Sequence, residues 1–300
     1  MTARRPLVLK LGGELIESAA DRARIAGAAR TLAAERALVV VHGGGRAIDA
    51  ELARRDIAPK KIDGLRITDA ATLDAVVAVL AGSANTDLVA SLVTAGIRAV
   101  GLTGADAGFG RSTRVAAHHA ANGTVVDLGW VGDPADVDAS LISLLIANGY
   151  VPVIASLGFS DAGVLNVNAD VMACRVAASL DDCDLVIAGT TAGVLDADGQ
   201  LIESLDAAAI DALIAGGTAT AGMITKLTAC KTALDEGVAS VSIVDGRRLG
   251  DSRVNGTTVT NGSGIRRSAP GTRGELSVGV ANYKAEHISS AERRVPSAGQ

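Results

Sequence analysis

Two lysines of this sequence stand where a cation is costly. Lys10 lies among apolar residues just before Gly12 and Gly13, and Lys226 lies in the first turns of a predicted helix. A buried ammonium group needs an anion, and the start of a helix carries partial positive charge. A bound phosphate would satisfy both lysines. The alternatives are an edge-strand lysine beside an ordinary turn, and a surface lysine that reaches water.

Glycines follow two of the predicted strands. Gly12 and Gly13 end the first, and Gly43-Gly44-Gly45 separate the second from a predicted helix. Glycine lets backbone N–H groups approach a phosphate closely, and a helix N-terminus adds to the attraction. A tight strand-to-helix turn is the alternative. The sequence contains neither GxxxxGK[ST] nor a GxGxxG at this place, which disfavours a P-loop or a dinucleotide site.

A third group of polar residues opens a predicted helix. Asn168 suits the N-cap and Asp170 the first turn, but capping does not explain Asn166. Together with the two lysines, these residues indicate transfer of a phosphoryl group to a carboxylate, in which the barrier is largely electrostatic. The lysines would neutralise the phosphoryl group, and Asp170 could hold both of them in place.

Short apolar runs alternate with Ala-rich helical stretches, a pattern typical of βαβ units. It predicts an α/β fold, a three-layer αβα sandwich with a central, mostly parallel sheet and β-hairpins over the site. The predicted strands are Leu7–Leu11, Leu38–His42, Arg98–Thr103, Val151–Ser156, Asp184–Ala188 and Ser240–Val244. The predicted helices are 21–34, 46–54, 69–95, 136–148, 168–179, 206–214 and 223–236. Hairpins are predicted at Ser112–Val131 and Leu157–Asn166, both after a core strand.

Composition limits the class of protein. Hydrophobic residues make up 48% of the 300 residues and aromatics only 2%, which predicts a core of aliphatic side chains. The net charge of −5 disfavours nucleic acid as a partner. The three cysteines form no CxxC pair, and the sequence predicts no metal site. Cys174 and Cys230 lie in apolar helical patterns and are interpreted as buried thiols. We find no targeting segment and no apolar run near the roughly 20 residues of a membrane span, so a cytoplasmic protein is expected.

The pattern predicts a single domain over residues 1–260. Residues 261–300 are rich in Gly, Ser and Arg and are predicted to form a flexible tail.

The order of the motifs resembles the amino-acid kinase family from about Leu7 to Val259. The matching motifs are Lys10-Leu-Gly-Gly, His42-Gly-Gly-Gly, Gly64-Leu-Arg-Ile-Thr68, Gly101-Leu-Thr-Gly104, Asn166-Val-Asn-Ala-Asp170 and Gly222-Met-Ile-Thr-Lys226. The resemblance implies a kinase domain over residues 1–260, whose N-terminal half, about 1–165, binds the substrate and whose C-terminal half, about 166–260, binds the nucleotide. It also implies the use of ATP and Mg²⁺, the metal being carried by the nucleotide. It further implies phosphorylation of the γ-carboxylate of N-acetyl-L-glutamate, in arginine biosynthesis.

The resemblance also assigns roles to residues by position. It implies catalytic roles for Lys10, Lys226 and Asp170. The implied substrate-binding residues are Gly44, Gly45, Arg66 and Asn166. The implied nucleotide- and phosphate-binding residues are Gly12, Gly13, Thr190, Gly193, Gly222 and Met223. The chain departs from the family at Gly189-Thr190-Thr191, where members usually carry an acid.

Two other functions remain open at this stage. One is a sister kinase acting on an aminoadipate derivative or carbamate, although the motif around Arg66 favours acetylglutamate. The other is a non-catalytic relative that binds a ligand without phosphorylating it. Because Lys10 lies close to the first residue, with no helix before it, the resemblance further predicts a homodimer that is insensitive to arginine.

Overall fold

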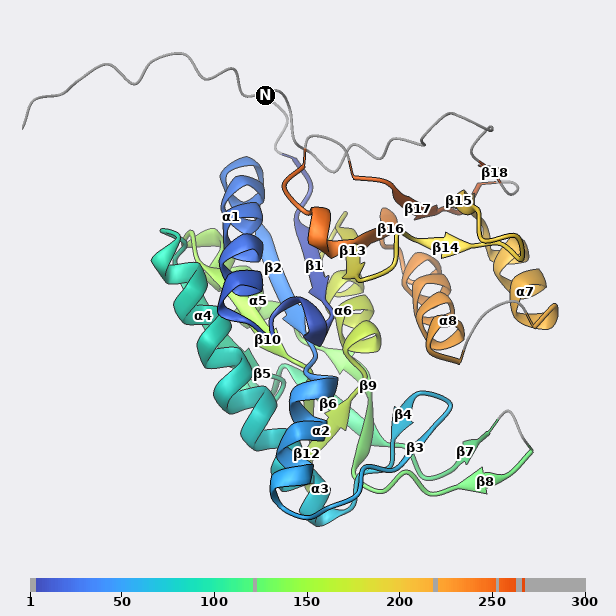
Figure 1. Cartoon of the computed structure of the whole chain (residues 1–300). Helices are drawn as coiled ribbons and strands as arrows, with labels where there is room; N and C mark the ends of the chain where they lie inside the picture. The colour runs from blue at the N-terminus through green and yellow to red at the C-terminus, as the bar shows by residue number, and fades with distance from the viewer. Residues whose placement is uncertain (1–3, 121–122, 218–220, 252–253, 263–265, 268–300) are drawn as a thin grey trace, which may run out of the picture.

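A ten-stranded sheet forms the centre of the computed structural model, which describes residues 4–120, 123–217, 221–251, 254–262 and 266–267 (Figure 1). Its strand order is β14 (Val194–Leu195), β15 (Leu201–Leu205), β17 (Gly256–Val259), β16 (Ser240–Asp245), β13 (Asp184–Gly189), β1 (Leu7–Leu11), β2 (Leu38–His42), β10 (Val151–Ala155) and β5 (Ala99–Thr103), with β18 (Arg266–Arg267) paired to β15. The six strands from β16 to β5 run parallel, and they are the six predicted core strands.

Helices cover both faces of this sheet. Buried residues of α1 (Ala19–Glu35) and α4 (Asn85–Thr94) pack on one face. Those of α5 (Ser140–Ala147), α6 (Ala169–Ala178), α7 (Ala207–Ala215) and α8 (Ala221–Asp235) pack on the other. This arrangement confirms the predicted three-layer sandwich. Shorter helical segments join the strands: η1 (Gly13–Leu15), α2 (Gly45–Arg54), α3 (Ala70–Val77), η2 (Ala78–Ala84), η3 (Asp106–Gly108) and η4 (Gly246–Arg248).

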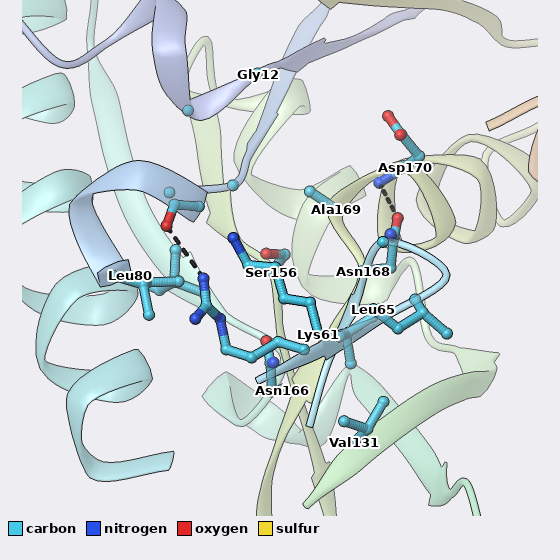
Figure 2. Close-up of a pocket in the computed structure, with 18 of the residues that line it drawn as sticks. Gly12, Lys61, Leu65, Leu80, Val131, Ser156, Asn166, Asn168, Ala169 and Asp170 are labelled. Atoms are coloured by element: carbon cyan, nitrogen blue, oxygen red, sulfur yellow. Dashed lines mark hydrogen bonds between the residues drawn. The ribbon is translucent and has the colours of Figure 1, made fainter. Parts of the chain in front are cut away.

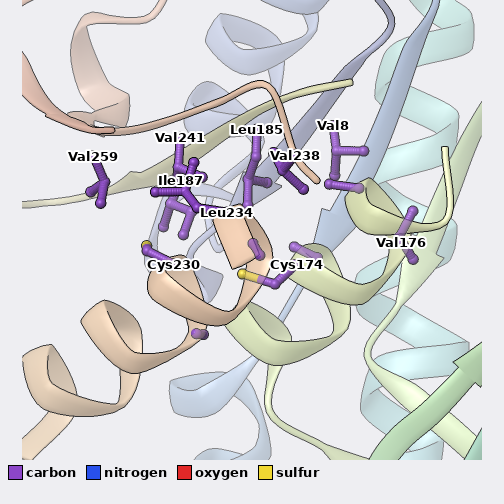
Figure 3. Packing of buried hydrophobic residues seen from close by; sticks show 14 of the residues in the cluster. Val8, Cys174, Val176, Leu185, Ile187, Cys230, Leu234, Val238, Val241 and Val259 are labelled. Carbon is purple, nitrogen blue, oxygen red and sulfur yellow. The ribbon is translucent and has the colours of Figure 1, made fainter. Parts of the chain in front are cut away.

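Alternation along β1 decides which side of the sheet receives Lys10. Leu7, Leu9 and Leu11 join the cluster under α1 and α4, whereas Val8 joins the cluster under α6 and α8 (Figure 3). Successive strand side chains point to opposite faces, so Lys10 lies on the same face as Val8. The sheet therefore directs the Lys10 side chain toward α6.

The strands that follow β5 and β10 close into a small barrel instead of forming two separate hairpins. Its strand order is β11 (Leu157–Ser160), β12 (Gly163–Val167), β9 (Val131–Val137) and β6 (Gly110–Arg114). Two ribbons accompany it, β3 (Lys61–Ile62) with β4 (Leu65–Arg66) and β7 (His118–His119) with β8 (Val125–Val126). Both predicted hairpins are present, but closure pairs their free edges, which leaves fewer unsatisfied backbone groups.

Three local predictions need correction. The helix predicted at 136–148 begins at Ser140, because Asp136 and Val137 pair with β6 as part of β9. The segment predicted as one helix, 69–95, is π-helical in its middle third, η2. The predicted tail includes β18, which pairs with β15; residues 263–265 and 268–300 lie outside the described residues.

One helical segment is a longer apolar stretch than we expected from the sequence. The segment Ala70–Thr94 is long and apolar enough to cross a membrane by length and composition alone. Here Leu88 and Leu92 of this segment are fully buried in the cluster under α1. Such a core helix of an α/β domain passes the same test of length and composition.

Candidate active site

Lys10, Asp170 and Lys226 meet at one point, although they come from β1, α6 and α8. The Nζ atom of Lys10 lies 2.9 Å from Oδ1 of Asp170, and the Nζ atom of Lys226 lies 2.9 Å from Oδ2. The Asn168 side chain caps α6 by accepting hydrogen bonds from the backbone N–H groups of Asp170 and Val171, at 2.8 and 3.2 Å. That cap fixes the first helical turn, from which Asp170 projects.

The charges of this trio depend on one another. Burial alone raises the pKa of Asp170, but the attraction of Lys10 and Lys226 outweighs it and holds this pKa well below its usual value. Burial and repulsion by Lys10 lower the pKa of Lys226, and the Asp170 carboxylate opposes them. One anion between two cations leaves a surplus of positive charge, which a phosphoryl group can neutralise.

A cavity of about 440 Å³ opens beside the trio, between the sheet and the barrel. In Figure 2, Gly12 lies on one side of it and Lys61, Leu65 and Asn166 lie on the other. Eight of the predicted site residues line it: Lys10, Gly12, Gly13, Gly44, Gly45, Arg66, Asn166 and Asp170. The volume falls in the range of small-molecule sites. Lys226 does not itself line the cavity, but it pairs with Asp170, which does.

The glycine loops Gly12-Gly13 and Gly43-Gly44-Gly45 both line the cavity and are in contact with each other. A Cβ atom on Gly13 would lie 2.8 Å from the Cα atom of Gly44 and 3.0 Å from the nitrogen of Gly45. A Cβ atom on Gly44 would lie 2.9 Å from Leu80 Cδ2. The Gly13 position therefore requires glycine for packing, because its neighbours are backbone atoms, whereas a side chain on Gly44 would require Leu80 to shift. The N–H group of Gly12 already donates to the Ala188 carbonyl at 2.9 Å, so the free start of helix α2 at Gly45 is the better source of phosphate-binding amides.

His42 orients the second glycine loop from below. It is fully buried, and burial lowers its pKa to about 4, against a small opposing effect of its hydrogen bond to Gly43. The neutral ring donates from Nδ1 to the Gly43 carbonyl at 3.1 Å, so its Nε2 accepts from the Asn85 amide, also at 3.1 Å. His42 is therefore a positioning residue with a fixed tautomer.

Arg66 lies on the far wall with its guanidinium buried. Its Nη2 donates to the Gly45 carbonyl at 3.1 Å and lies 2.6 Å from Asp49 Oδ1. Within the described part of the chain, its Nη1 has no hydrogen-bond partner. Asn166 stands nearby, where its amide donates to Thr68 Oγ1 at 3.1 Å. A guanidinium with one free nitrogen beside a carboxamide suits the carboxylate of a small acid.

Gly12 and Gly13 line the cavity, but the other predicted nucleotide residues, Thr190, Gly193, Gly222 and Met223, lie outside it, around the ends of β13 and β16 and the start of α8. The Thr190 carbonyl accepts a hydrogen bond from Arg247 Nη2 at 2.8 Å. Gly193, at φ 147°, packs tightly against Thr257. Gly222 is exposed, near the Gly64 turn, and Met223 packs against the core cluster of α8. Lys226 in the same helix is what links this region to the cavity.

Sequence reasoning missed three polar residues that line the cavity: Glu14, Lys61 and Ser156. Glu14 directly follows the first glycine pair, and Ser156 directly follows strand β10. The ends of parallel strands are where ligands bind in such sheets, so position alone could have found both. Lys61 pairs with Asp49 at 2.7 Å on the β3–β4 ribbon, and no local pattern pointed to it.

The sequence profile of the amino acid kinase family matches residues 5–245, and the chain belongs to this family. Its curated relatives include the acetylglutamate kinase of Marinomonas sp., 38% identical over 254 residues, which are 82% of this chain and 83% of the relative. Those of Symbiobacterium thermophilum and Nitrobacter winogradskyi are 44% and 45% identical over 214 residues, 70% of this chain and 73% and 72% of theirs.

Solved structures show the same fold. A protein from Streptococcus mutans superposes with a TM-score of 0.70 at 30% identity, over 86% of this chain and 99% of the other. N-acetylglutamate synthase from Neisseria gonorrhoeae superposes with a TM-score of 0.73 at 23% identity, over 86% of this chain and 60% of the synthase. The carbamate kinase of Giardia has a TM-score of 0.61 at 15% identity, over 87% of this chain and 100% of that chain. The last two likenesses concern the fold alone.

Proposed function

We propose that this protein is an acetylglutamate kinase, which transfers the γ-phosphoryl group of ATP to the γ-carboxylate of N-acetyl-L-glutamate. The observation that carries the proposal is the sharing of one buried carboxylate, Asp170, by Lys10 and Lys226 beside a glycine-walled cavity. Relatives bearing that name match 70–82% of the chain. The product, an acyl phosphate, would serve arginine biosynthesis.

In the proposed reaction an oxygen of the γ-carboxylate attacks the γ-phosphorus of ATP. The bond to the β,γ-bridging oxygen breaks, and ADP leaves with that electron pair. Both reactants are anions, so catalysis consists mainly of positioning and charge neutralisation. Lys10 and Lys226 would stabilise the charge on the phosphoryl oxygens, and Asp170 would keep the two ammonium groups close together.

The substrate acid would bind to the far wall of the cavity. Arg66 lines this wall, and among the described residues its buried Nη1 has no hydrogen-bond partner. A guanidinium is suited to a carboxylate because its donors are planar and parallel. Asn166 would hold the same substrate through its carboxamide. Gly44 and Gly45, with no side chains between them and the cavity, would let the acid and the phosphoryl group approach the backbone.

The nucleotide would lie over the C-terminal half, with its phosphates toward Gly12 and Gly13 and its remainder toward Thr190, Gly193, Gly222 and Met223. Within the described residues, no group of three or more His, Cys, Asp or Glu side chains could hold a metal ion. We propose that Mg²⁺ arrives with ATP, because Mg²⁺ keeps its waters and uses substrate phosphates as ligands. When bound, it offsets the charge of the phosphates.

We further propose a homodimer. Strand β5 is an edge of the sheet, and Val93 of α4 and Leu144 of α5 are 53% and 61% exposed. A parallel edge strand with apolar helices beside it is a surface that a second copy can cover. Analytical ultracentrifugation at micromolar concentration tests this; a monomer would contradict it.

The free, buried cysteines support a cytoplasmic location, and one catalytic domain over residues 1–260 remains our proposed organisation.

The test of the function is ADP release by the purified protein with ATP, Mg²⁺ and N-acetyl-L-glutamate. Parallel reactions with N-acetyl-aminoadipate and with carbamate compare the sister activities. We expect kcat/KM to be highest for acetylglutamate. Faster turnover of either rival acid contradicts the substrate assignment, and calorimetric binding of acetylglutamate without any ADP release indicates a non-catalytic relative.

A further inference from the structure

Glu14 brings a carboxylate to the phosphate side of the cavity. It begins the short helix η1 together with Gly13 and is half-buried. Its carboxylate lies against Gly12: a Cβ atom on Gly12 would be 2.4 to 2.7 Å from its three terminal atoms. The same carboxylate lies 3.7 Å from the corresponding point on Gly189, at the end of β13. Glu14 therefore stands between the ends of two adjacent parallel strands.

This carboxylate differs from the other acids of the site because, in the part of the chain that the structure describes, it forms no ion pair. Asp170 carries one ammonium group on each oxygen, and Asp49 is shared by Lys61 and Arg66. Among the described residues, no ion pair or hydrogen bond of the Glu14 side chain is found, and Glu14 and Asp170 are the two carboxylates that line the cavity.

An unpaired carboxylate at a phosphate site is costly unless a cation joins it. Bare ATP would bring several negative charges against it, and like charges at close range repel. Mg²⁺ removes the conflict, because this ion is bound in phosphoryl-transfer sites by one or two carboxylates, the substrate phosphates and water. One protein carboxylate is what such an ion needs here, and Asp170 is already neutralised by its lysines.

We propose that Glu14 is the protein ligand, direct or through a water molecule, for the divalent cation that accompanies the nucleotide. The inference rests on the proposed use of Mg²⁺-ATP. The inference adds that Glu14 makes the protein bind the metal-bound nucleotide in preference to the metal-free one. Removing the charge of Glu14 should therefore change the binding of metal and of bare nucleotide in opposite directions.

The experiment measures binding rather than turnover. Mn²⁺ is titrated into the full chain saturated with the non-hydrolysable ATP analogue AMP-PNP, and free Mn²⁺ is followed by electron paramagnetic resonance. In a second titration, AMP-PNP is added in EDTA without metal and followed by calorimetry. For Glu14→Gln we expect Mn²⁺ affinity to fall about tenfold or more. Affinity for metal-free AMP-PNP should stay the same or rise, because a repulsive charge is gone.

Glu17→Gln is the matched control. Glu17 lies in the same loop, but its carboxylate faces Arg46 at 3.4 Å and does not line the cavity. It should leave both affinities unchanged. Glu14→Asp, which keeps the charge on a shorter arm, should retain part of the Mn²⁺ affinity and serves in place of Glu14→Gln should that variant not fold.

Two results overturn the inference: unchanged Mn²⁺ affinity in Glu14→Gln, or an equal loss of nucleotide affinity with and without metal. Neither depends on which acid is phosphorylated. A wild-type protein that binds Mn²⁺-AMP-PNP through Glu14 but releases no ADP with acetylglutamate would support this inference and defeat the proposed function. ADP release with acetylglutamate, together with an unchanged Mn²⁺ affinity in Glu14→Gln, would support the proposed function and overturn this inference.

Discussion

The ammonium groups of Lys10 and Lys226 are held by opposite oxygens of a single carboxylate, each at 2.9 Å. The two lysines come from strand β1 and from helix α8, more than 200 positions apart in the sequence. Neither side chain is more than 15% exposed. Two buried cations this close are stable only with an anion between them, and they attract a second anion.

Replacing either lysine of the pair should lower turnover more than binding. For Lys10→Met and Lys226→Met we expect kcat to fall about 10² to 10³-fold, because the charge they meet is greatest in the transition state. The KM for acetylglutamate should change by less than about tenfold. Steady-state ADP release measures both constants. Lys231→Met is the control, since Lys231 lies on the same helix but pairs with Asp211. Equal losses in kcat and in affinity would refute the assigned roles.

Removing the shared carboxylate should destabilise the fold as well as the site. Asp170→Asn leaves two buried ammonium groups without a counter-charge, a change that costs about 3 to 5 kcal/mol for buried pairs. Urea unfolding at pH 7 measures it. Asp211→Asn, which breaks the exposed pair with Lys231, should cost about 1 kcal/mol or less. Similar losses in the free energy of unfolding of the two variants would contradict the burial of Lys10, Asp170 and Lys226.

Arg66→Lys should weaken substrate binding while leaving the chemistry nearly intact. A lysine keeps the positive charge but loses the planar donors that pair with a carboxylate and with the Gly45 carbonyl. Loss of a charged hydrogen bond of about 1.5 to 3 kcal/mol corresponds to a KM raised roughly 10- to 100-fold. Arg55→Lys, in an exposed pair with Glu51, is the control. A fall in kcat with unchanged KM would place Arg66 in the chemical step instead.

The contact between the glycine loops predicts a large difference between two similar substitutions. In Gly13→Ala the new methyl group meets backbone atoms of Gly44 and Gly45, which have no rotamer to change. We expect a loss of about 1 to 3 kcal/mol and reduced affinity for the nucleotide. Gly27→Ala, at an exposed position of helix α1 with nothing within 4 Å of the new atom, should instead gain about 0.5 to 1 kcal/mol. Thermal unfolding distinguishes them; a stable, active Gly13→Ala would disprove the packing argument.

The buried His42 predicts how stability depends on pH. Its pKa is lowered from 6.5 to about 4 in the folded protein, so in this range the unfolded chain binds the proton more tightly. Its contribution to stability is therefore complete above pH 6.5 and is lost as pH falls toward 4, by roughly 3 kcal/mol in total. Asp170, whose pKa is also lowered, acts only below its ordinary value of 3.8.

Urea unfolding of the wild type and of His42→Gln at intervals from pH 7.5 to pH 4.5 separates this effect from the rest. The variant should be less stable at neutral pH, because the hydrogen bonds to Gly43 and Asn85 are altered. Its stability should, however, fall less steeply below pH 6.5 than that of the wild type. Parallel curves for the two proteins would rule out His42 as the group that titrates.

Local sequence was enough to predict the frame of the fold. Apolar runs such as Leu7–Leu11 and Leu38–His42 match strands β1 and β2 residue for residue. Gly96, Gly149 and Gly237, which follow predicted helices, all have positive φ. These features depend on burial of a parallel strand on both faces and on the missing Cβ of glycine, which are properties of short segments. Lysines and glycines at the ends of strands and helices indicated the phosphate chemistry, because their placement can also be recognised within short segments.

The tertiary structure alone determined which strands of the two hairpins pair and which distant side chains are in contact. The closed barrel arises because two hairpins distant in sequence pair with each other, and no residue in either predicts its partner. The sequence analysis suggested that Asp170 could hold both lysines, and the folded chain contains both ion pairs. Only the folded chain pairs Lys61 and Arg66 with Asp49 and, among the described residues, leaves the Glu14 carboxylate without an ion pair. Spacing in a sequence fixes side-chain direction within one element, whereas ion pairing depends on distances between elements, which the packing of the whole sheet sets.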